Sequence, residues 1–324
     1  MFLTFIALFL LFSIGYLAQT TGLCLVRGVS EAFALDAEHE TKKPQFLLAI
    51  LLSGSGSLGT FAVAYALSLE ISGTFVYLDI SLAFAAIFGG LLFGTGAALN
   101  GGCGVSTLSK LARGKIVMLA TIIGWIFGWF LLAITLQAIG SFVTTLFASN
   151  TSFIDEMSFY VSPHFRFGVI GAVFVGVFTW ALFKGRELKL MWLSMLAIGF
   201  MGSLVFLIEP GWTPSSFLKG FIQQTVLNQG SSEFLTVRYF YITALVAGMF
   251  CAAFLTASFA FERAKIKGIF THFMAGTLMG IGGAIAGGGN DNQLLVSLPA
   301  LSIYGLLAVG SMVGSIYFVK CRFK

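Results

Sequence analysis

Long apolar runs separated by short polar segments dominate the pattern of hydrophobic and polar positions along this chain. Nine of these runs have roughly the 20 apolar residues that a helix needs to cross a bilayer. They lie at about 2–22, 45–69, 80–100, 116–137, 166–183, 190–208, 239–261, 269–288 and 300–319. The pattern predicts an all-α, polytopic membrane protein with about nine transmembrane helices in a single membrane domain, residues 1–324, and no soluble domain.

The third run ends in a cluster of glycines around a cysteine, Asn100-Gly-Gly-Cys-Gly-Val105. Glycine is a poor helix former and readily takes a positive φ, so a helix that runs through Leu99 should break here. A second, short helix can start after the break, over Val105 to Leu111. We therefore expect a re-entrant half-helix inside the membrane.

The glycine cluster occurs a second time in the chain. Shifting the numbering by 186 places Gly89–Leu108 on Ala275–Leu294, and eight of the twenty pairs are identical. In the second copy Gly289 takes the position of Cys103, and Asn290-Asp-Asn-Gln293 follows it. The match predicts a pseudo-repeat with halves of about 1–165 and 166–324.

The composition is that of a membrane protein. Of the 324 residues, 58% are hydrophobic and 10% are charged, whereas about a quarter of the residues of soluble domains are charged. The four cysteines form no C-x-x-C pair, so neither a thioredoxin-like redox pair nor a zinc site is indicated. The first seventeen residues lack a positive n-region, and Leu23 rather than a small residue precedes Cys24, so we expect a transmembrane helix there.

Basic residues alternate between the gaps that separate the runs. Fifteen of the eighteen lie on one side of the predicted membrane, and only Arg166, Lys219 and Arg238 lie on the other. By the positive-inside rule the first side is cytoplasmic. We therefore expect the N-terminus outside and the C-terminus in the cytoplasm, and the net charge of +5 reflects this topology and not a nucleic-acid partner.

This topology gives the two glycine clusters opposite directions. The segment 80–100 would run inward and the segment 269–288 outward, which makes the repeat an inverted one. Inverted repeats with helices interrupted near the membrane centre are typical of secondary transporters. The competing interpretation, glycines that only let helices pack closely, suits Gly94 and Gly96 but does not easily explain three consecutive helix-breaking residues.

Two cysteines stand at predicted helix interruptions. Cys103 lies inside the first glycine cluster, and Cys24 lies between Gly22 and Gly28. We expect both thiols to line a pathway. Cys251 and Cys321 have no such surroundings and are expected to be ordinary thiols.

Unpaired main-chain N–H groups at the start of a helix attract anions. A short helix after Cys103 would present such groups within the membrane, and both glycine clusters have side-chain donors beside them. The predicted substrate is a small anion, and its pathway is formed by Cys24, Gly102, Cys103, Gly104, Ser106, Thr107, Gly288, Gly289, Asn290, Asp291 and Asn292. No pair of histidines has metal-ligand spacing, and we expect neither a metal nor a cofactor.

Asp291 complicates an anion pathway because a carboxylate would repel the substrate. An acid near the bilayer centre is costly to bury and is therefore a functional candidate. It could be protonated, take part in proton coupling, or lie in water at the outer mouth, and the last position is favoured. His272 is expected to be a hydrogen-bonded packing residue, and the gap 209–236 an interfacial loop on the outer face.

Three motifs together resemble the YeeE/YedE family of bacterial inner-membrane proteins. They are Gly22-Leu-Cys-Leu-Val-Arg-Gly28, the run Asn100–Leu108 with the basic residues after it, and Ala286-Gly-Gly-Gly-Asn290. The resemblance covers essentially the whole chain, and characterised members of that family take up thiosulfate. It implies an hourglass-shaped helical protein with inverted halves, in which short helices meet at a constriction. It also implies that cysteine thiols pass thiosulfate inward through S–H···S hydrogen bonds without cleaving it.

Carried over by position, Cys24 matches the first cysteine of the family and Cys103 the central one. The third cysteine would fall at Gly289, so this chain lacks it. A relay with one thiol missing could work less well, could use Asn290 or Asn292 as substitute donors, or could carry a different sulfur compound. The basic cytoplasmic loops also leave open the docking of a soluble sulfur-carrier protein.

The leading functional prediction is an inner-membrane transporter or channel, not an enzyme, for a small sulfur-containing anion such as thiosulfate. A membrane thiol oxidoreductase or sulfurtransferase acting through Cys24 and Cys103 is the alternative from another class. It is disfavoured because the sequence shows neither a general base nor a paired cysteine beside them, and a thiol needs such help to become reactive. A structural subunit without a translocated solute would have its two glycine clusters far apart or facing lipid.

Overall fold

The computed structural model describes residues 2–35, 42–57, 80–148, 163–183, 185–209, 211–225, 232–263, 265–298 and 302–323. This part of the chain is helical and contains no extended strand. Its elements are α1 (Phe2–Thr21), α2 (Leu25–Phe33), α3 (Gln45–Leu52), η1 (Ser53–Ser57), α5 (Ile80–Asn100), α6 (Gly104–Ala112), α7 (Met118–Ala148), α8 (Pro163–Leu182), α9 (Arg186–Ile208), α10 (Pro214–Thr225), α11 (Ser232–Leu255), α12 (Ile266–Ile285), α13 (Asn290–Asn292), the π-helical η4 (Gln293–Ser297) and α14 (Ile303–Arg322).

Seven segments of the described chain are long and apolar enough to cross a membrane. They are Leu3–Phe33, Ala83–Ala112, Met118–Thr135, Arg186–Ile208, Thr236–Leu255, Ile266–Ile285 and Ile303–Arg322. Exposed phenylalanines such as Phe5, Phe9 and Phe84 cover helix surfaces, as contact with lipid requires. The prediction of an all-helical, multi-pass membrane protein is confirmed.

The remaining two of the nine predicted crossings coincide with shorter apolar helices. The run 45–69 contains Gln45–Ser57, and the run 166–183 contains Gly171–Leu182. Residues 58–69 of the first run lie outside the described residues. Seven crossings are therefore the count that length and composition support for the described chain, against the nine expected.

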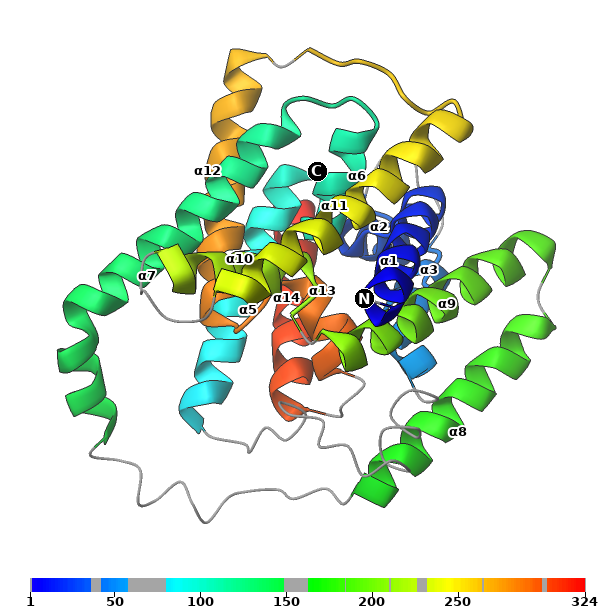
Figure 1. Ribbon diagram of the computed structural model, residues 1–324, viewed down its shortest axis with the longest axis horizontal. Coiled ribbons are helices and arrows are strands. Elements are labelled where there is room, and N and C mark those ends of the chain that lie inside the picture. Colours follow the sequence, from blue (N-terminus) through cyan, green and yellow to red (C-terminus); the bar gives the residue numbers. More distant parts are fainter. Residues whose placement is uncertain are drawn as a thin grey trace.

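Helices α5 and α12 pack against each other and run in opposite directions (Figure 1). Gly96, near the end of α5, lies against Ala275 in the first half of α12, whereas Gly89 lies against Ala286 just beyond its end. A Cβ atom at Gly96 would lie 2.5 Å from the Ala275 carbonyl oxygen, and one at Gly89 would lie 2.6 Å from the Ala286 nitrogen. The two backbones meet closely because these positions carry no side chain.

Helices α14 and α7 flank this central pair. Gly90 and Gly94 of α5 contact α14, and Gly276 and Gly280 of α12 contact α7. The shift of 186 residues that aligns the two glycine clusters also places Gly90 on Gly276 and Gly94 on Gly280. Aligned glycines therefore make equivalent helix contacts.

The helices α1, α5 and α12 end in the same way. Gly22, Gly101 and Gly287 follow or nearly follow the last helical residue and have φ angles of +70°, +66° and +66°. In each case the backbone N–H of the residue after the glycine donates to the carbonyl oxygen of the residue five positions before it. The donor–acceptor distances are 3.0, 2.9 and 2.8 Å respectively. This is the Schellman ending, which favours glycine because a side chain is strained at positive φ. The break predicted in both glycine clusters is confirmed, and α1 has the same break.

A fourth break lies in the stretch that the sequence assigns to an outer loop, 209–236. Helix α9 ends at Ile208, and α10 begins at Pro214 and packs against α7, α11 and α13. Trp212, between the two helices, is 3% exposed. The interfacial-loop prediction is wrong for this segment, because Pro214 opens a helix at the position that favours proline and the segment is buried against other helices.

Candidate functional site

Cys24 and Cys103 occupy the same place in two different breaks. Each precedes a nine-residue helix, α2 or α6, and has extended backbone, with φ −154° and ψ 115° at Cys24 and φ −79° and ψ −177° at Cys103. Neither side chain caps its helix. Both thiols are therefore available for contacts other than helix capping.

The two thiols meet inside the protein. The Cys24 and Cys103 side chains lie against each other, and the Ser106 side chain lies beside Cys24. Cys24 is 7% exposed and Cys103 is 0% exposed, and both are free thiols. The expectation that no paired cysteine stands beside Cys103 is wrong, because the packing of the two breaks joins residues that are far apart in sequence.

Backbone N–H groups surround the two sulfur atoms. Those of Arg27 and Cys103 lie near the Cys24 sulfur, and those of Leu25 and Ser106 lie near the Cys103 sulfur. The start of each helix also carries the positive end of its dipole. Two helix starts and two S–H groups are thus directed at one place, which is an arrangement that suits an anion.

The second glycine cluster repeats this backbone around Gly289. With φ −76° and ψ −173°, Gly289 has nearly the conformation of Cys103 and precedes α13. The space for a side chain there is filled, since a Cβ atom would lie 2.4 Å from the Ser215 hydroxyl oxygen and 2.8 Å from Asp291 Oδ1. Because α13 packs against both α6 and α10, the two clusters lie next to each other and are not separated by the width of the bundle.

Ser215 and Asp291 form a buried polar pair at the start of α10. The Ser215 backbone N–H donates to Asp291 Oδ2 at 2.9 Å, the Ser215 hydroxyl donates to Asp291 Oδ1, and the Gly289 N–H donates to the Ser215 hydroxyl oxygen at 2.9 Å. Asp291 is 3% exposed. The favoured prediction for Asp291, a position in water at the outer mouth, is wrong, because the start of α10 supplies donors that hold the carboxyl group inside the protein.

The other predicted pathway residues lie around these helix starts. Most are buried, and Asn292 is half-buried with its side chain against Gly288. Asn290 is 3% exposed, and its side-chain oxygen has no hydrogen-bond partner in the described part of the chain. The residues in this buried group are Gly102, Gly104, Ser106, Thr107, Gly288 and Asn290.

Basic side chains cover the ends of α1 and α5 at the cysteine breaks. Lys110 Nζ donates to the Gly101 carbonyl oxygen at 2.7 Å, and Arg113 donates to the Gln19 carbonyl oxygen at 3.2 Å. Carbonyl groups at a helix end carry partial negative charge, so these contacts are favourable. They also place positive charge on one side of the two thiols.

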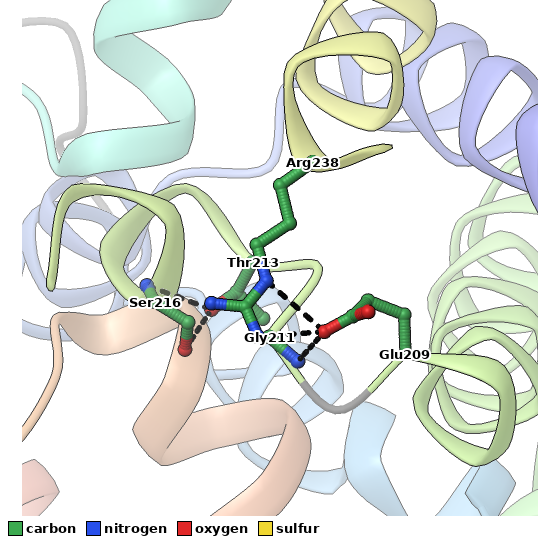
Figure 2. Close-up of polar contacts among 5 residues, drawn as sticks. All are labelled: Glu209, Gly211, Thr213, Ser216 and Arg238. Carbon is green, nitrogen blue, oxygen red and sulfur yellow. Dashed lines mark hydrogen bonds and ion pairs between the residues drawn. The ribbon is translucent and has the colours of Figure 1, made fainter. Parts of the chain in front are cut away.

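An ion pair between Arg238 and Glu209 lies at the fourth break, between α9 and α10 (Figure 2). Both Nε and an NH2 group of Arg238, on α11, donate to Glu209 Oε1, at 3.0 and 2.7 Å, and the Gly211 N–H donates to the same oxygen at 3.2 Å. The Thr213 hydroxyl donates to the Ser216 hydroxyl at 2.9 Å and accepts from the Ser216 N–H at 3.3 Å. The Arg238 bonds fasten α11 to the end of α9, and the Thr213–Ser216 bonds fix the first turn of α10, which contains Ser215.

Comparison with known proteins assigns the chain to a family. The model of the sulphur transport family matches residues 22–318, which is most of the chain. The chain belongs to the sulphur transport family. A relative, the thiosulfate transporter TsuA of Spirochaeta thermophila, is 25% identical over 275 residues, which cover 72% of this chain and 74% of the relative. The predicted resemblance to the YeeE/YedE proteins is confirmed by these two matches.

This sulphur transport protein fixes its first break with a buried network centred on Asn100, which the sequence did not single out. The Asn100 amide donates to the Gly102 carbonyl oxygen at 2.9 Å and to the Thr107 hydroxyl oxygen at 2.8 Å. Its side-chain oxygen accepts from Thr121 and lies 2.7 Å from His272 Nδ1. The prediction that His272 is a hydrogen-bonded packing residue agrees with this contact.

Two tryptophans of the sulphur transport protein could not be singled out from the sequence either. Trp125 and Trp129, one turn apart on α7, are 2% and 7% exposed. Their indole N–H groups have no hydrogen-bond partner in the described residues. The Trp125 ring packs on Gly104, where a Cβ atom would lie 2.7 Å from it, and Trp129 Nε1 lies near Gly283. Unpaired buried donors are rare, so these two are further candidates for contact with an anion.

Proposed function

We propose that the chain carries a small sulfur-containing anion, with thiosulfate as the cargo, across the bacterial inner membrane past Cys24 and Cys103. The contact between these two buried thiols at the starts of α2 and α6 is the observation that carries the proposal. Membership of the sulphur transport family and the similarity to a relative named as a thiosulfate transporter support it.

The recognition chemistry follows from the donors around the thiols. Helix starts supply N–H groups and partial positive charge for the anion's oxygen atoms. The S–H groups of Cys24 and Cys103 supply polarizable donors for its terminal sulfur atom, which sulfate lacks. Lys110, on α6, adds positive charge near the same place. The cargo would pass by exchanging hydrogen bonds, with its S–S bond intact.

We further infer that the two halves of the chain form an inverted repeat around this site. The opposite directions of α5 and α12 and the equivalent contacts of aligned glycines support that inference. The charge distribution supports an N-terminus outside and a C-terminus in the cytoplasm. The side that carries Lys110 and Arg113 would then face the cytoplasm and offer a docking surface for a soluble sulfur-carrier protein.

A thiol oxidoreductase or sulfurtransferase is the second candidate function, because the structure brings the two cysteines into contact. Such an enzyme would form a covalent bond to Cys24 or Cys103 during turnover. The described residues place no histidine or carboxylate in hydrogen-bond contact with either sulfur atom. The geometry therefore favours passage over covalent catalysis.

Uptake of radiolabelled thiosulfate by proteoliposomes tests the proposal. We expect uptake well above that of empty liposomes, inhibition by unlabelled thiosulfate and by a selenium-containing analogue, and little inhibition by sulfate. Thiosulfate recovered from the lumen should be intact. Uptake no faster than in empty liposomes would contradict transport, and a persulfide or mixed disulfide trapped on Cys103 during turnover would favour the enzyme instead.

A further inference from the structure

The Ser215–Asp291 pair stands where the second glycine cluster has no thiol. Gly289 matches Cys103 in backbone conformation. The position that a side chain at 289 would occupy is already in contact with the Ser215 hydroxyl and the Asp291 carboxyl group. Ser215 and Asp291 thus fill the space beside Gly289, before α13. The corresponding space beside the backbone of residue 103, before α6, holds the Cys103 side chain.

No cation neutralises Asp291 among the ion pairs of the described chain. The hydrogen bonds to its carboxyl group come from the hydroxyl and N–H of Ser215. A buried carboxylate without a cation is costly, and the usual remedy is to bind a proton.

The elements packed against α13 bring few titratable groups near it. Helix α10 carries Lys219, which is exposed, and α6 carries Lys110, which bonds to the Gly101 carbonyl oxygen, with Cys103 before its first residue. The segment η4 carries no titratable group. Among the titratable groups on these described elements, Asp291 is therefore the carboxyl group whose negative charge would repel a bound anion.

Two buried acceptors beside Asp291 lack a donor. The side-chain oxygens of Asn290 and Gln293 have no hydrogen-bond partner in the described chain, and these residues are 3% and 1% exposed. The Gln293 amide nitrogen already donates to the Ala286 carbonyl oxygen, which fixes the orientation of that side chain. Unpaired buried acceptors favour a ligand that brings a hydrogen, and they do not favour a second anion.

We propose that Asp291 binds a proton that enters together with the sulfur anion, so that the chain is a proton–anion symporter. Protonation converts the carboxylate to a neutral carboxyl group, which removes the repulsion and frees the Ser215 N–H, at the start of α10, for the cargo. The proton leaves to the cytoplasmic side after the anion has passed, and the carboxylate returns to Ser215. This inference rests on the proposed transport function and names its driving ion.

Thiosulfate uptake by proteoliposomes with and without an inward proton gradient tests the coupling. In the parent chain the gradient should speed uptake several-fold, and thiosulfate should in turn drive proton entry reported by a pH dye in the lumen. In Asp291→Asn the rate should no longer depend on the gradient. Glu187→Gln, which removes an exposed carboxylate at the start of α9, should behave as the parent.

The outcomes separate coupling from transport itself. If the parent takes up thiosulfate equally fast with and without the gradient, or if folded Asp291→Asn keeps the acceleration, the coupling is wrong and transport stands. If the parent shows no uptake in either condition, the proposed function is wrong. Should Asp291→Asn not fold, as judged by size-exclusion chromatography, Ser215→Ala decides: coupling predicts a changed pH dependence of uptake, and an unchanged profile overturns it.

Discussion

Replacing Cys103 by alanine should abolish growth of an uptake-deficient bacterium on thiosulfate as the only sulfur source. The variant removes one S–H donor from the contact with Cys24. A hydrogen bond to a charged group contributes about 1.5–3 kcal/mol, which corresponds to a loss of about ten- to a hundredfold in uptake. The side chain does not cap α6, so the helix itself should remain intact. Doubling time and the initial rate of labelled thiosulfate uptake measure the effect.

Cys251 provides the matched control for this substitution. It is a free, partly buried cysteine on α11, outside the predicted pathway, and Cys251→Ala should support growth at the parental rate. Cys103→Ser, which keeps a donor but lacks the polarizable sulfur, should fall between the two. Parental growth of Cys103→Ala, with the protein present at normal level, would show that the thiol has no part in transport.

Replacing Gly289 by cysteine should destabilise the protein and reduce uptake, even though the family resemblance implies a third cysteine at this position. A Cβ atom at this position would lie 2.4 Å from the Ser215 hydroxyl oxygen and 3.1 Å from a carbon of the Phe93 ring. Overpacking of this kind costs about 1–3 kcal/mol. The melting temperature in detergent should therefore fall, and the second substitution Ser215→Ala should recover most of the loss because it removes the nearest atom.

Gly310 is the matched control for added bulk. It lies on α14, and a Cβ atom there would have no neighbouring atom within 4 Å. Gly310→Ala should be neutral or slightly stabilising, since alanine favours a helix over glycine by about 1 kcal/mol. If Gly289→Cys melts at the parental temperature without Ser215→Ala, the space at this break is not filled by the Ser215–Asp291 pair.

The helix breaks could be predicted from the sequence because they depend on local backbone preferences. Gly101 and Gly287 take positive φ, and the half-helix Gly104–Ala112 begins one residue before the predicted start and ends one residue after the predicted end. The end of the predicted run 190–208 agrees with the end of α9 at Ile208, but helix α10 was not predicted because its short, mixed polar and apolar sequence is typical of a loop. The Thr213-Pro214 pair was an available signal, since threonine often precedes a helix and proline often begins one.

The partners of the site residues could not be predicted. Cys24 meets Cys103, and Ser215 meets Asp291, only because four broken helices converge, and convergence depends on how closely α5, α12 and their neighbours cross. The burial of Asp291 is a tertiary effect of the same kind. From the sequence alone, a carboxyl group next to glycines is consistent with a position in water at the outer end of the pathway. The packing of the start of α10 against Asp291 is what buries it.

Protection of Cys103 from alkylation tests most directly whether the thiols line the route of the anion. The intact protein is treated with a small alkylating reagent, with thiosulfate or with sulfate, and the modification of each cysteine is followed by mass spectrometry. Cys321, which is exposed at the end of α14, reports in the same sample any consumption of the reagent. We predict that thiosulfate, and not sulfate, slows modification of Cys103 while Cys321 reacts at an unchanged rate. An equal rate at Cys103 with and without thiosulfate, or no reaction there in the folded protein, would contradict a sulfur-lined pathway.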